Sequence, residues 1–321
     1  MSKRRVLTIL DDYQGIALRS ADWSSLLDVF DIDVVERHLE GAELLERIRS
    51  SEAIVAMRER TAFPAEVLES LPSLRLLVTT GMRNASIDLD AASRAGIVVC
   101  GTGSAGNGVA ELTIGMMIAL MRHFVEEDAA VRSGGWQHTI GPGLAERTLG
   151  VLGLGRLGVP VARLAQAFGM RVIAWSRSLT QDRASEHGVT AVTRDELFSV
   201  PDIMTIHLPL TPGTRGLVGA AELALMREDA YLINTSRGPI VDEAALLDAL
   251  RNGSIAGAAL DVYDREPMPA DHPLRSTPNT LLLPHIGYVS TDNYRAFYGD
   301  AVDDVLAYLG GTPVRVLTAQ A

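Results

Sequence analysis

The sequence predicts an α/β protein with two units, each built on a doubly wound parallel sheet. The chain has 321 residues, and because domains of roughly 100–200 residues are usual, two domains are expected. Short apolar runs alternate with amphipathic segments in both halves, which is the pattern of parallel strands covered by helices on both faces. A glycine-rich turn in the second half indicates a nucleotide-binding sheet.

The first hundred residues contain apolar runs that predict the strands of the first sheet. These runs read "VLTIL", "DIDVV", "AIVAM", "LRLLVTT" and "GIVVC". Amphipathic segments such as 41–50 and 64–70 lie between them and predict helices.

A second series of strands begins near residue 148. Its candidates read "TLGVLG", "RVIAW", "DIMTIHL", "AYLINT", "AGAALDV" and "TLLLP". Helices are predicted at 157–168, 222–226 and 243–252. The last of these has a candidate N-cap in Asp242, and Gly253 follows its end.

Residues 106–123 join the two series and predict a long apolar helix. A glycine-rich arm with a tryptophan follows at 132–143. Helix and arm form either a subunit interface or a helix buried between the domains of one chain, and the sequence leaves both open. From residue 291 onward, one more amphipathic helix and a tail are expected.

Composition excludes several classes of protein. The formal net charge is −11 and the acidic excess is scattered, which argues against nonspecific nucleic-acid binding. The chain has one cysteine, Cys100, which rules out an intrachain disulfide and suits a reducing compartment. The first apolar run ends at Asp11, as in a strand rather than a signal peptide, and the longest apolar helical segment, 112–121, is too short to span a membrane. We expect a cytoplasmic protein with no membrane partner.

The glycine-rich turn reads Gly153-x-Gly155-x-x-Gly158 and lies between a predicted strand and a predicted helix. In dinucleotide-binding sheets, the first glycine allows the tight turn and the second lets the backbone approach a pyrophosphate. The third allows close packing of helix and strand, and the helix N-terminus faces the phosphates. The alternative is a glycine-rich turn that binds no ligand.

Three charged or titratable residues follow predicted strands of the second series. They are Arg237 in "INTSRGPIVDE", Glu266 in "LDVYDREP" and His285 in "LLLPHIGY". An arginine holds a carboxylate, a histidine gives or takes a proton, and a glutamate in contact orients the imidazole. Each residue taken singly has another explanation: Arg237 forms a surface ion pair, His285 is structural, and Glu266 shapes a turn.

At these residues, nearly the whole chain resembles the D-isomer-specific 2-hydroxyacid dehydrogenase family. The resemblance is most specific in "GLGRLG", "HLPLTPGTRGLV", "LINTSRGPIVDEAAL", "GAALDVYDREP" and "LLLPHIG". It implies a flavodoxin-like catalytic, substrate-binding domain of residues 1–100 plus 289–321. It also implies a Rossmann dinucleotide-binding domain of residues 101–288, inserted between these two segments. The active site would then lie in the cleft, and two subunits would pair through the inserted domain as a homodimer.

The resemblance also implies an activity and a set of site residues. The family's enzymes act on the CH–OH group of 2-hydroxy acids with NAD or NADP, without a metal ion. Arg237, Glu266 and His285 map to its catalytic residues, with His285 as acid/base and Arg237 also binding the substrate carboxylate. The candidate cofactor-binding residues are Gly153, Gly155, Arg156, Leu157, Gly158, Ser176, Arg177, His207, Leu208, Pro209, Thr214, Thr235, Ser236, Asp261 and Gly287.

One segment departs from the family pattern. The family's substrate-binding loop of small residues corresponds to "TTGMRNASID", with candidate contacts at Gly81, Met82 and Arg83. Arg83 replaces the usual second glycine, and it adds a cation for a second acidic group, narrows the pocket or points to solvent. Glyoxylate, hydroxypyruvate and 3-phosphoglycerate-type substrates therefore stay open. The end of the sequence at residue 321 weighs slightly against a phosphoglycerate enzyme with a regulatory tail.

The segment after the "RVIAW" run predicts which nucleotide is preferred. Dinucleotide-binding sheets for NAD place an acid about 20 residues after the glycine turn, where it bonds the ribose hydroxyls. This chain has Ser176 and Arg177 there instead. A serine and an arginine favour a 2′-phosphate, so NADP is preferred and NAD is possible; the alternative is that Arg177 faces solvent.

Two other classes of protein stay open. A dinucleotide-binding corepressor and a redox-sensing scaffold without significant turnover would both keep the nucleotide site. The leading prediction remains an oxidoreductase that transfers a hydride between NAD(P)H and a small 2-keto or 2-hydroxy acid resembling glyoxylate or hydroxypyruvate.

Overall fold

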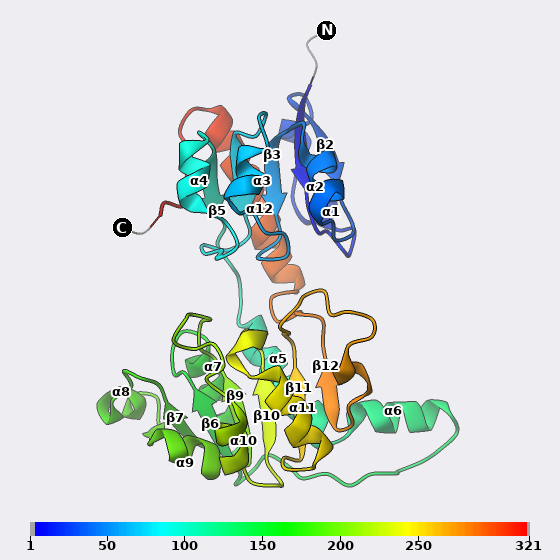
Figure 1. Ribbon diagram of the computed structural model, residues 1–321, viewed down its shortest axis with the longest axis vertical. Helices are drawn as coiled ribbons and strands as arrows, with labels where there is room; N and C mark the ends of the chain where they lie inside the picture. The colour runs from blue at the N-terminus through cyan, green and yellow to red at the C-terminus, as the bar shows by residue number, and fades with distance from the viewer. Residues whose placement is uncertain (1–3, 320–321) are drawn as a thin grey trace. The chain divides into compact units, whose positions relative to one another are not determined.

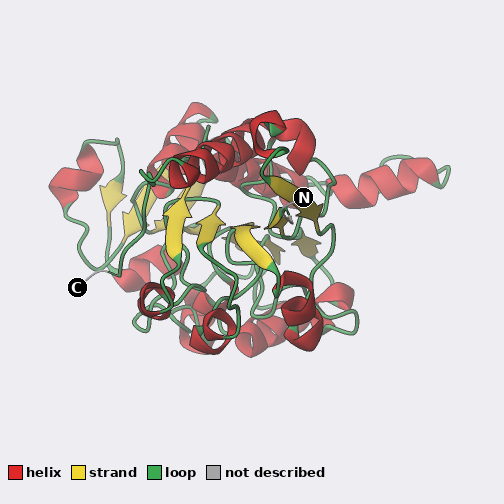
Figure 2. Cartoon of the chain, turned by 90° about the horizontal axis from the view of Figure 1, so that it is seen from above, coloured by secondary structure: helices red, strands yellow, loops and turns green. Residues whose placement is uncertain are grey.

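The computed structural model describes residues 4–319 and divides the chain into two compact units (Figure 1). The first unit comprises Met1–Gly106 and Ser290–Ala321. The second comprises Asn107–Val289 and is therefore an insertion in the sequence of the first. In the view from above, helices lie on both sides of the strands (Figure 2).

The first unit contains a five-stranded sheet in the order β2-β1-β3-β4-β5, and every pair is parallel. Its strands are β1 Arg5–Ile9, β2 Phe30–Val34, β3 Ser51–Ala56, β4 Leu76–Thr79 and β5 Val98–Gly101. The apolar runs predicted as strands all form strands. β4 is buried along its whole length, as expected of an inner parallel strand that is covered on both faces.

Helices of the first unit come from both ends of the sequence. They are α1 Ala17–Ser20, α2 Gly41–Ile48, α3 Ala65–Glu69, α4 Leu89–Arg94 and α12 Thr291–Leu309. α2, α3 and α12 were predicted, whereas α4, which Asp88 caps by accepting from the Ala91 N–H at 2.8 Å, was not. α12 packs on α1 and β4 through the buried rings of Tyr294, Phe297 and Tyr298, so the C-terminal helix completes the core of the N-terminal unit.

The second unit contains a seven-stranded parallel sheet in the order β12-β11-β10-β9-β6-β7-β8. Its strands are β6 Thr148–Leu152, β7 Arg171–Trp175, β8 Thr190–Ala191, β9 Ile203–Ile206, β10 Tyr231–Asn234, β11 Gly257–Leu260 and β12 Thr280–Leu282. The chain adds strands outward from β6 in one direction and from β9 in the other. The boundary between β6 and β9 is thus a topological switch point, where open α/β sheets bind ligands.

The helices of the second unit are α5 Gly108–Met121, α6 Phe124–Arg132, α7 Gly158–Ala167, α8 Gln181–Ser185, α9 Arg194–Ser199, α10 Ala220–Leu225 and α11 Glu243–Arg251. α5, α7, α10 and α11 were predicted, and Asp242 caps α11 by accepting from the Ala245 N–H at 3.1 Å. α6, α8, α9 and the two-residue β8 were not predicted.

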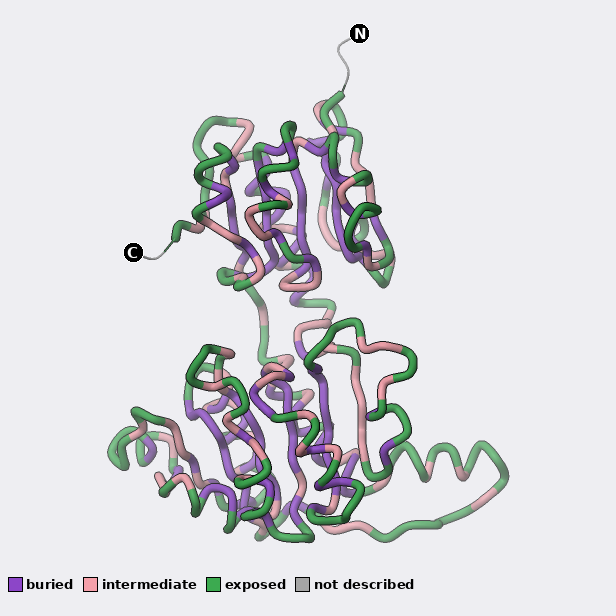
Figure 3. Tube along the Cα trace, in the orientation of Figure 1, coloured by how far each residue is buried: buried purple, intermediate pink, exposed green. Residues whose placement is uncertain are grey.

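The stretch between the two strand series has two different parts. α5 packs on α7 and β11 and is mostly buried, so it is a core helix of the second unit. The chain then turns at His123, whose φ of +52° is left-handed, and α6 buries none of its residues (Figure 3). Among residues 4–319, no single helix is long and apolar enough to cross a membrane; α5 and α6 pass such a test only together, across a bend of 61°.

Candidate active site

The glycine turn follows β6 and leads into α7. Gly153 has a φ of +102°, and its N–H donates to the Trp175 carbonyl at 2.9 Å. A Cβ atom on Gly158 would lie 2.1 Å from the Gly153 carbonyl oxygen, so a side chain there would push the helix away from the strand. The turn therefore requires glycine at both positions.

Space remains at the middle of the turn. A Cβ atom on Gly155 would meet no atom within 4 Å, so a ligand can approach this part of the backbone closely. Arg156 is exposed beside it, and Leu157 is the N-cap of α7, whose first N–H groups have no acceptor within the helix. This arrangement fits the pyrophosphate of a dinucleotide.

Ser176 and Arg177 lie directly after β7, the strand next to β6 in the sheet. Ser176 is half-buried and Arg177 is exposed. The Arg177 Nη2 donates to the Gly213 carbonyl at 3.5 Å, which places the guanidinium over the turn that leads to Thr214. Thr214 fixes this turn, because its Oγ1 donates to the Pro209 carbonyl at 2.7 Å.

His207 follows β9 on the other side of the switch point. Its ring is buried, and burial lowers the pKa of His207 to about 4, so the ring is uncharged at neutral pH. A Cβ atom on Gly153 would lie 2.9 Å from the His207 carbonyl oxygen, so the glycine turn lies directly against this strand end. The next carbonyl, that of Leu208, accepts from the Ser236 hydroxyl.

Thr235, which follows β10, is tied to α5. Its Oγ1 lies 2.9 Å from the Thr113 Oγ1. Because the single hydroxyl proton of Thr113 is donated to the Val109 carbonyl at 2.7 Å, Thr113 accepts from Thr235 in this contact. The Thr235 oxygen keeps its lone pairs for other donors.

Glu266 and His285 form a hydrogen-bonded pair. The Glu266 Oε2 lies 2.5 Å from the His285 Nδ1, and Oε1 accepts from the Tyr263 N–H at 2.9 Å. Their side chains keep 33% and 21% exposure, so the pair is reachable. Because Nδ1 faces the carboxylate, Nε2 is the ring nitrogen that faces other groups.

Asp261 holds the segment that carries His285. Its side chain is buried, and its two oxygens accept from the N–H groups of Ile286 at 2.7 Å and Gly287 at 2.8 Å. Burial raises the pKa of Asp261, while the two N–H donors oppose that shift. His285 has a φ of +55°, a conformation that these two bonds support.

Arg237 lies on the loop after β10, beside the loop that carries Glu266. Its Nη1 donates to the Ser236 carbonyl at 2.7 Å, and its own carbonyl accepts from the Asn234 Nδ2 at 3.0 Å. A Cβ atom on Gly238 would lie 2.1 Å from the Tyr263 carbonyl carbon, so the two loops touch backbone to backbone. Arg237, Glu266 and His285 thus follow three neighbouring strands, β10, β11 and β12, at one edge of the sheet.

Gly81, Met82 and Arg83 follow β4 in the first unit, whereas Arg237, Glu266 and His285 belong to the second. Gly81 has a φ of +88° and donates its N–H to the Thr102 Oγ1 at 2.8 Å. Met82 is 48% exposed and Arg83 is also exposed. Between residues 4 and 319, the N–H groups of Met82 and Arg83 have no acceptor, so both are available to an anion.

The sequence interpretation missed Arg58, which follows β3. A Cβ atom on Gly81 would lie 1.8 Å from the Arg58 Nη1, so this guanidinium lies against the loop after β4. It also donates to the Thr80 carbonyl at 3.2 Å. A charged residue two or three positions after a buried strand was the available signal, the same signal that identified Arg237.

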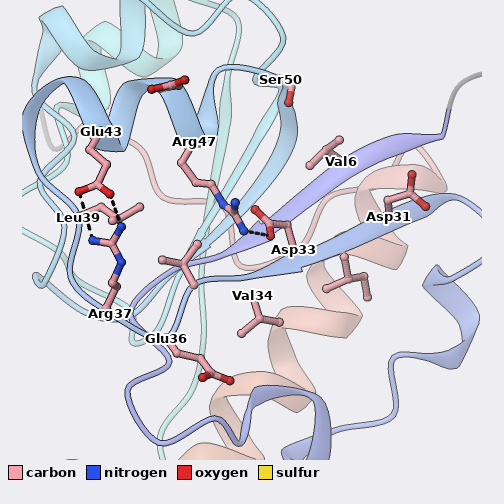
Figure 4. A pocket seen from close by; sticks show the side chains of 13 residues that line it. Val6, Asp31, Asp33, Val34, Glu36, Arg37, Leu39, Glu43, Arg47 and Ser50 are labelled. Atoms are coloured by element: carbon pink, nitrogen blue, oxygen red, sulfur yellow. Dashed lines mark hydrogen bonds and ion pairs between the residues drawn. The ribbon is translucent and has the colours of Figure 1, made fainter.

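A surface groove of about 870 Å³ lies elsewhere in the first unit, along β2 and α2 (Figure 4). Both of its arginines pair with acids of the groove, Arg37 with Glu43 and Arg47 with Asp33. None of the candidate site residues lines it. We assign no site to this groove.

The family model "D-isomer specific 2-hydroxyacid dehydrogenase, NAD binding domain" matches residues 114–287, which span the glycine turn, Arg237, Glu266 and His285. The chain belongs to this family. The predicted family and the predicted pair of parallel-sheet α/β domains are both confirmed.

Relatives of this chain differ in length and in the activity that their names state. The chain is 36% identical over 287 residues to a D-3-phosphoglycerate dehydrogenase of Bacillus subtilis, covering 88% of this chain and 54% of that one. It is 37% identical over 278 residues to a glyoxylate reductase of Aeropyrum pernix, covering 84% and 83%. The chain thus spans about half the length of the first relative. The crystal structure of a putative D-3-phosphoglycerate dehydrogenase from Ralstonia solanacearum superposes with a TM-score of 0.91 at 33% identity, covering 97% and 96%.

Proposed function

We propose that this protein is an NAD(P)-dependent oxidoreductase that interconverts a small 2-keto acid and its 2-hydroxy acid. The Glu266–His285 pair carries the proposal, because it presents an imidazole at the same sheet edge as a glycine turn that fits a dinucleotide. A family of dehydrogenases with this fold supports the same chemistry.

In this proposal, each of the three site residues has its own role in the reaction. A bound nicotinamide dinucleotide supplies or accepts the hydride at C2 of the substrate. In the reducing direction, His285 donates the proton on Nε2 to the keto oxygen, and in the oxidising direction it takes that proton back. Glu266 keeps the ring oriented and stabilises its positive charge, and Arg237 holds the substrate carboxylate and polarises the carbonyl.

The two units would divide the ligands. We assign the dinucleotide to the inserted segment 101–288. Besides Arg237, we propose contacts to the substrate carboxylate from the segment formed by 1–100 and 289–321, where the N–H groups of Met82 and Arg83 and the Arg58 side chain offer positive charge. Glyoxylate- or hydroxypyruvate-like acids fit this assignment, and the glyoxylate reductase relative supports it.

The test is reduction of a panel of 2-keto acids by NADPH and by NADH, followed by absorbance of the reduced cofactor. We expect at least one small keto acid to be turned over. If both cofactors bind and no keto acid on the panel is reduced, the enzyme proposal fails, and a corepressor or redox-sensing role takes its place.

We further propose that NADPH is preferred to NADH. No acid follows β7, Ser176 offers a hydroxyl, and Arg177 lies over the turn at Gly213 where it can reach a 2′-phosphate. Arg177→Ala should lower the NADPH-to-NADH ratio of kcat/KM by about tenfold, the worth of a charge-assisted contact. Arg183→Ala, which removes an exposed arginine six positions later, is the control. Equal kcat/KM values for the two cofactors in the unsubstituted protein would contradict the preference.

We propose a homodimer formed through α6 and the arm that follows it. This segment exposes Phe124, Val125, Val131, Trp136 and Ile140, the last two by 75% and 96%. Such an apolar surface on one projecting segment is typical of a protein interface. Light scattering of Trp136→Ser with Ile140→Ser should show a monomer where the parent is a dimer; a monomeric parent would contradict this proposal.

A further inference from the structure

Tyr263 lies buried between the ends of β11 and β12, the two strands that lead to Glu266 and His285. The last backbone bond between these strands runs from the Leu283 N–H to the Leu260 carbonyl at 2.8 Å. β12 ends at Leu282, and beyond the Leu283 bond the described residues form no further backbone hydrogen bond between the two strand ends.

The Tyr263 hydroxyl contacts both strand ends beyond that point. It lies 2.8 Å from the Leu283 carbonyl oxygen and 3.1 Å from the Leu260 carbonyl oxygen. A phenol has one proton, so the two carbonyls share it, with the nearer Leu283 oxygen as the main acceptor. Because the residue is buried, water does not compete for these bonds.

The phenol acts only as a donor. Burial raises the pKa of Tyr263, and the nearby carboxylates of Asp261 and Glu266 raise it further. The hydroxyl thus stays protonated over the range in which enzymes are assayed, which excludes Tyr263 as an acid or base in the proposed reaction.

The backbone of the same residue holds the other partner of the pair. The Tyr263 N–H donates to the Glu266 Oε1 at 2.9 Å, and the Glu266 Oε2 meets His285. His285 in turn lies two residues after Leu283, the acceptor of the hydroxyl. One residue therefore contacts both chain segments that carry the Glu266–His285 pair.

We propose that the Tyr263 hydroxyl is a positioning group that sets the distance between Glu266 and His285 by tying the ends of β11 and β12. This role rests on the proposed function of the pair. Without the hydroxyl, the segment after Leu283 loses this tie at its near side and keeps the bonds at its far side, where the Asp261 carboxylate accepts from Ile286 and Gly287.

The test is Tyr263→Phe, which keeps the ring and removes the donor. We expect kcat to fall about tenfold, with KM for the keto acid within about twofold, since substrate contacts remain. We also expect the alkaline limb of the kcat profile for reduction to move to lower pH, because a displaced Glu266 stabilises the charged ring less. A purely structural role of the Tyr263 hydroxyl would leave the alkaline limb of the kcat profile at its parental pH.

The matched control is Tyr231→Phe. Tyr231 is half-buried at the start of β10, the opposite end of the sheet from the pair, and should keep the parental kcat and pH profile. A parental kcat and pH profile in Tyr263→Phe would overturn the proposal, as would equal losses in both variants.

A second pair of variants distinguishes the loss of the hydrogen-bond donor from a change in packing. It also keeps the proposal testable if Tyr263→Phe does not fold. Residue 263 is replaced by p-aminophenylalanine, which keeps a donor, or by p-methylphenylalanine, which keeps only the size. We expect the first to restore kcat and the second not to; equal kcat values would overturn the proposal. An NMR titration of the His285 ring needs no turnover, so it still tests positioning if the parent reduces no keto acid.

Discussion

The two sheets end in loops that differ in how firmly they hold their polar groups. At the edge of the second sheet, Asp261 and Ser236 are bonded to backbone groups of neighbouring loops, and Glu266 is bonded to a backbone N–H of its own loop. At the edge of the first sheet, the N–H groups of Met82 and Arg83 have no acceptor in the described residues, and both side chains are exposed. We infer that the second edge is preorganised for one chemistry, while the first edge is open to different acids and so decides substrate choice.

The largest expected effect comes from the edge of the second sheet, which we call the rigid edge. His285→Ala removes the proposed acid/base and should lower kcat/KM by about 10²–10⁴-fold, while cofactor binding measured by fluorescence stays close to the parent. The matched control is His272→Ala, because His272 also pairs with a glutamate, Glu243, at 2.9 Å in the same unit. A similar loss of activity in both variants would show that the His285 effect is structural.

The second effect concerns the carboxylate that holds the His285 segment. In Asp261→Asn, the amide oxygen still accepts one backbone N–H, but the NH₂ group faces the other, which is left without an acceptor. We expect a loss of about 1–3 kcal/mol in the free energy of unfolding and a drop in kcat of at least about tenfold. Asp264→Asn, which changes an exposed acid of the same loop, should change neither the free energy of unfolding nor kcat strongly. An active and fully stable Asp261→Asn protein would contradict a rigid second edge.

The first unit buries a carboxyl group in its core, away from the Met82–Arg83 loop in sequence. Asp304 on α12 is fully buried beside Arg315, whose Nε donates to it at 3.0 Å, and Asp300 and Asp303 lie nearby. Burial raises the pKa of Asp304 to about 7. The folded protein therefore binds this proton more tightly than the unfolded chain does.

The sign of the pH dependence follows from that shift. The contribution of Asp304 to stability is complete below the pKa of an unfolded aspartate, about 4, and is lost as pH rises through about 7. Urea unfolding of the parent and of Asp304→Asn at several pH values should show a difference that changes by up to roughly 4 kcal/mol over this window. A constant difference would mean that Asp304 does not titrate in the folded state.

The sequence predicted the sheets and the residues of the rigid edge because both depend on local signals. Apolar runs identified β1 and β12 alike, and Arg237, Glu266 and His285 each follow such a run. The bonds that fix them were not predictable, because the Tyr263 hydroxyl and the Asp261 carboxylate meet carbonyls and N–H groups about 20 or more residues away in the chain. α6 was missed because its apolar residues lie on exposed surface and form no buried face.

The smallest effect is expected at the edge of the first sheet. It tests most directly whether this edge, unlike that of the second sheet, decides substrate choice. Arg83→Ala removes an exposed cation without altering the Met82 and Arg83 N–H groups, so a monocarboxylic keto acid should keep its kcat/KM within about threefold. A keto acid with a second acidic group should lose a few-fold more, as expected for an exposed ion pair worth up to about 1 kcal/mol. The measurement is the ratio of kcat/KM for glyoxylate and for a dicarboxylic keto acid. An unchanged ratio would remove the Arg83 side chain from substrate choice and leave Arg58, which lies against Gly81, as the cation to substitute next.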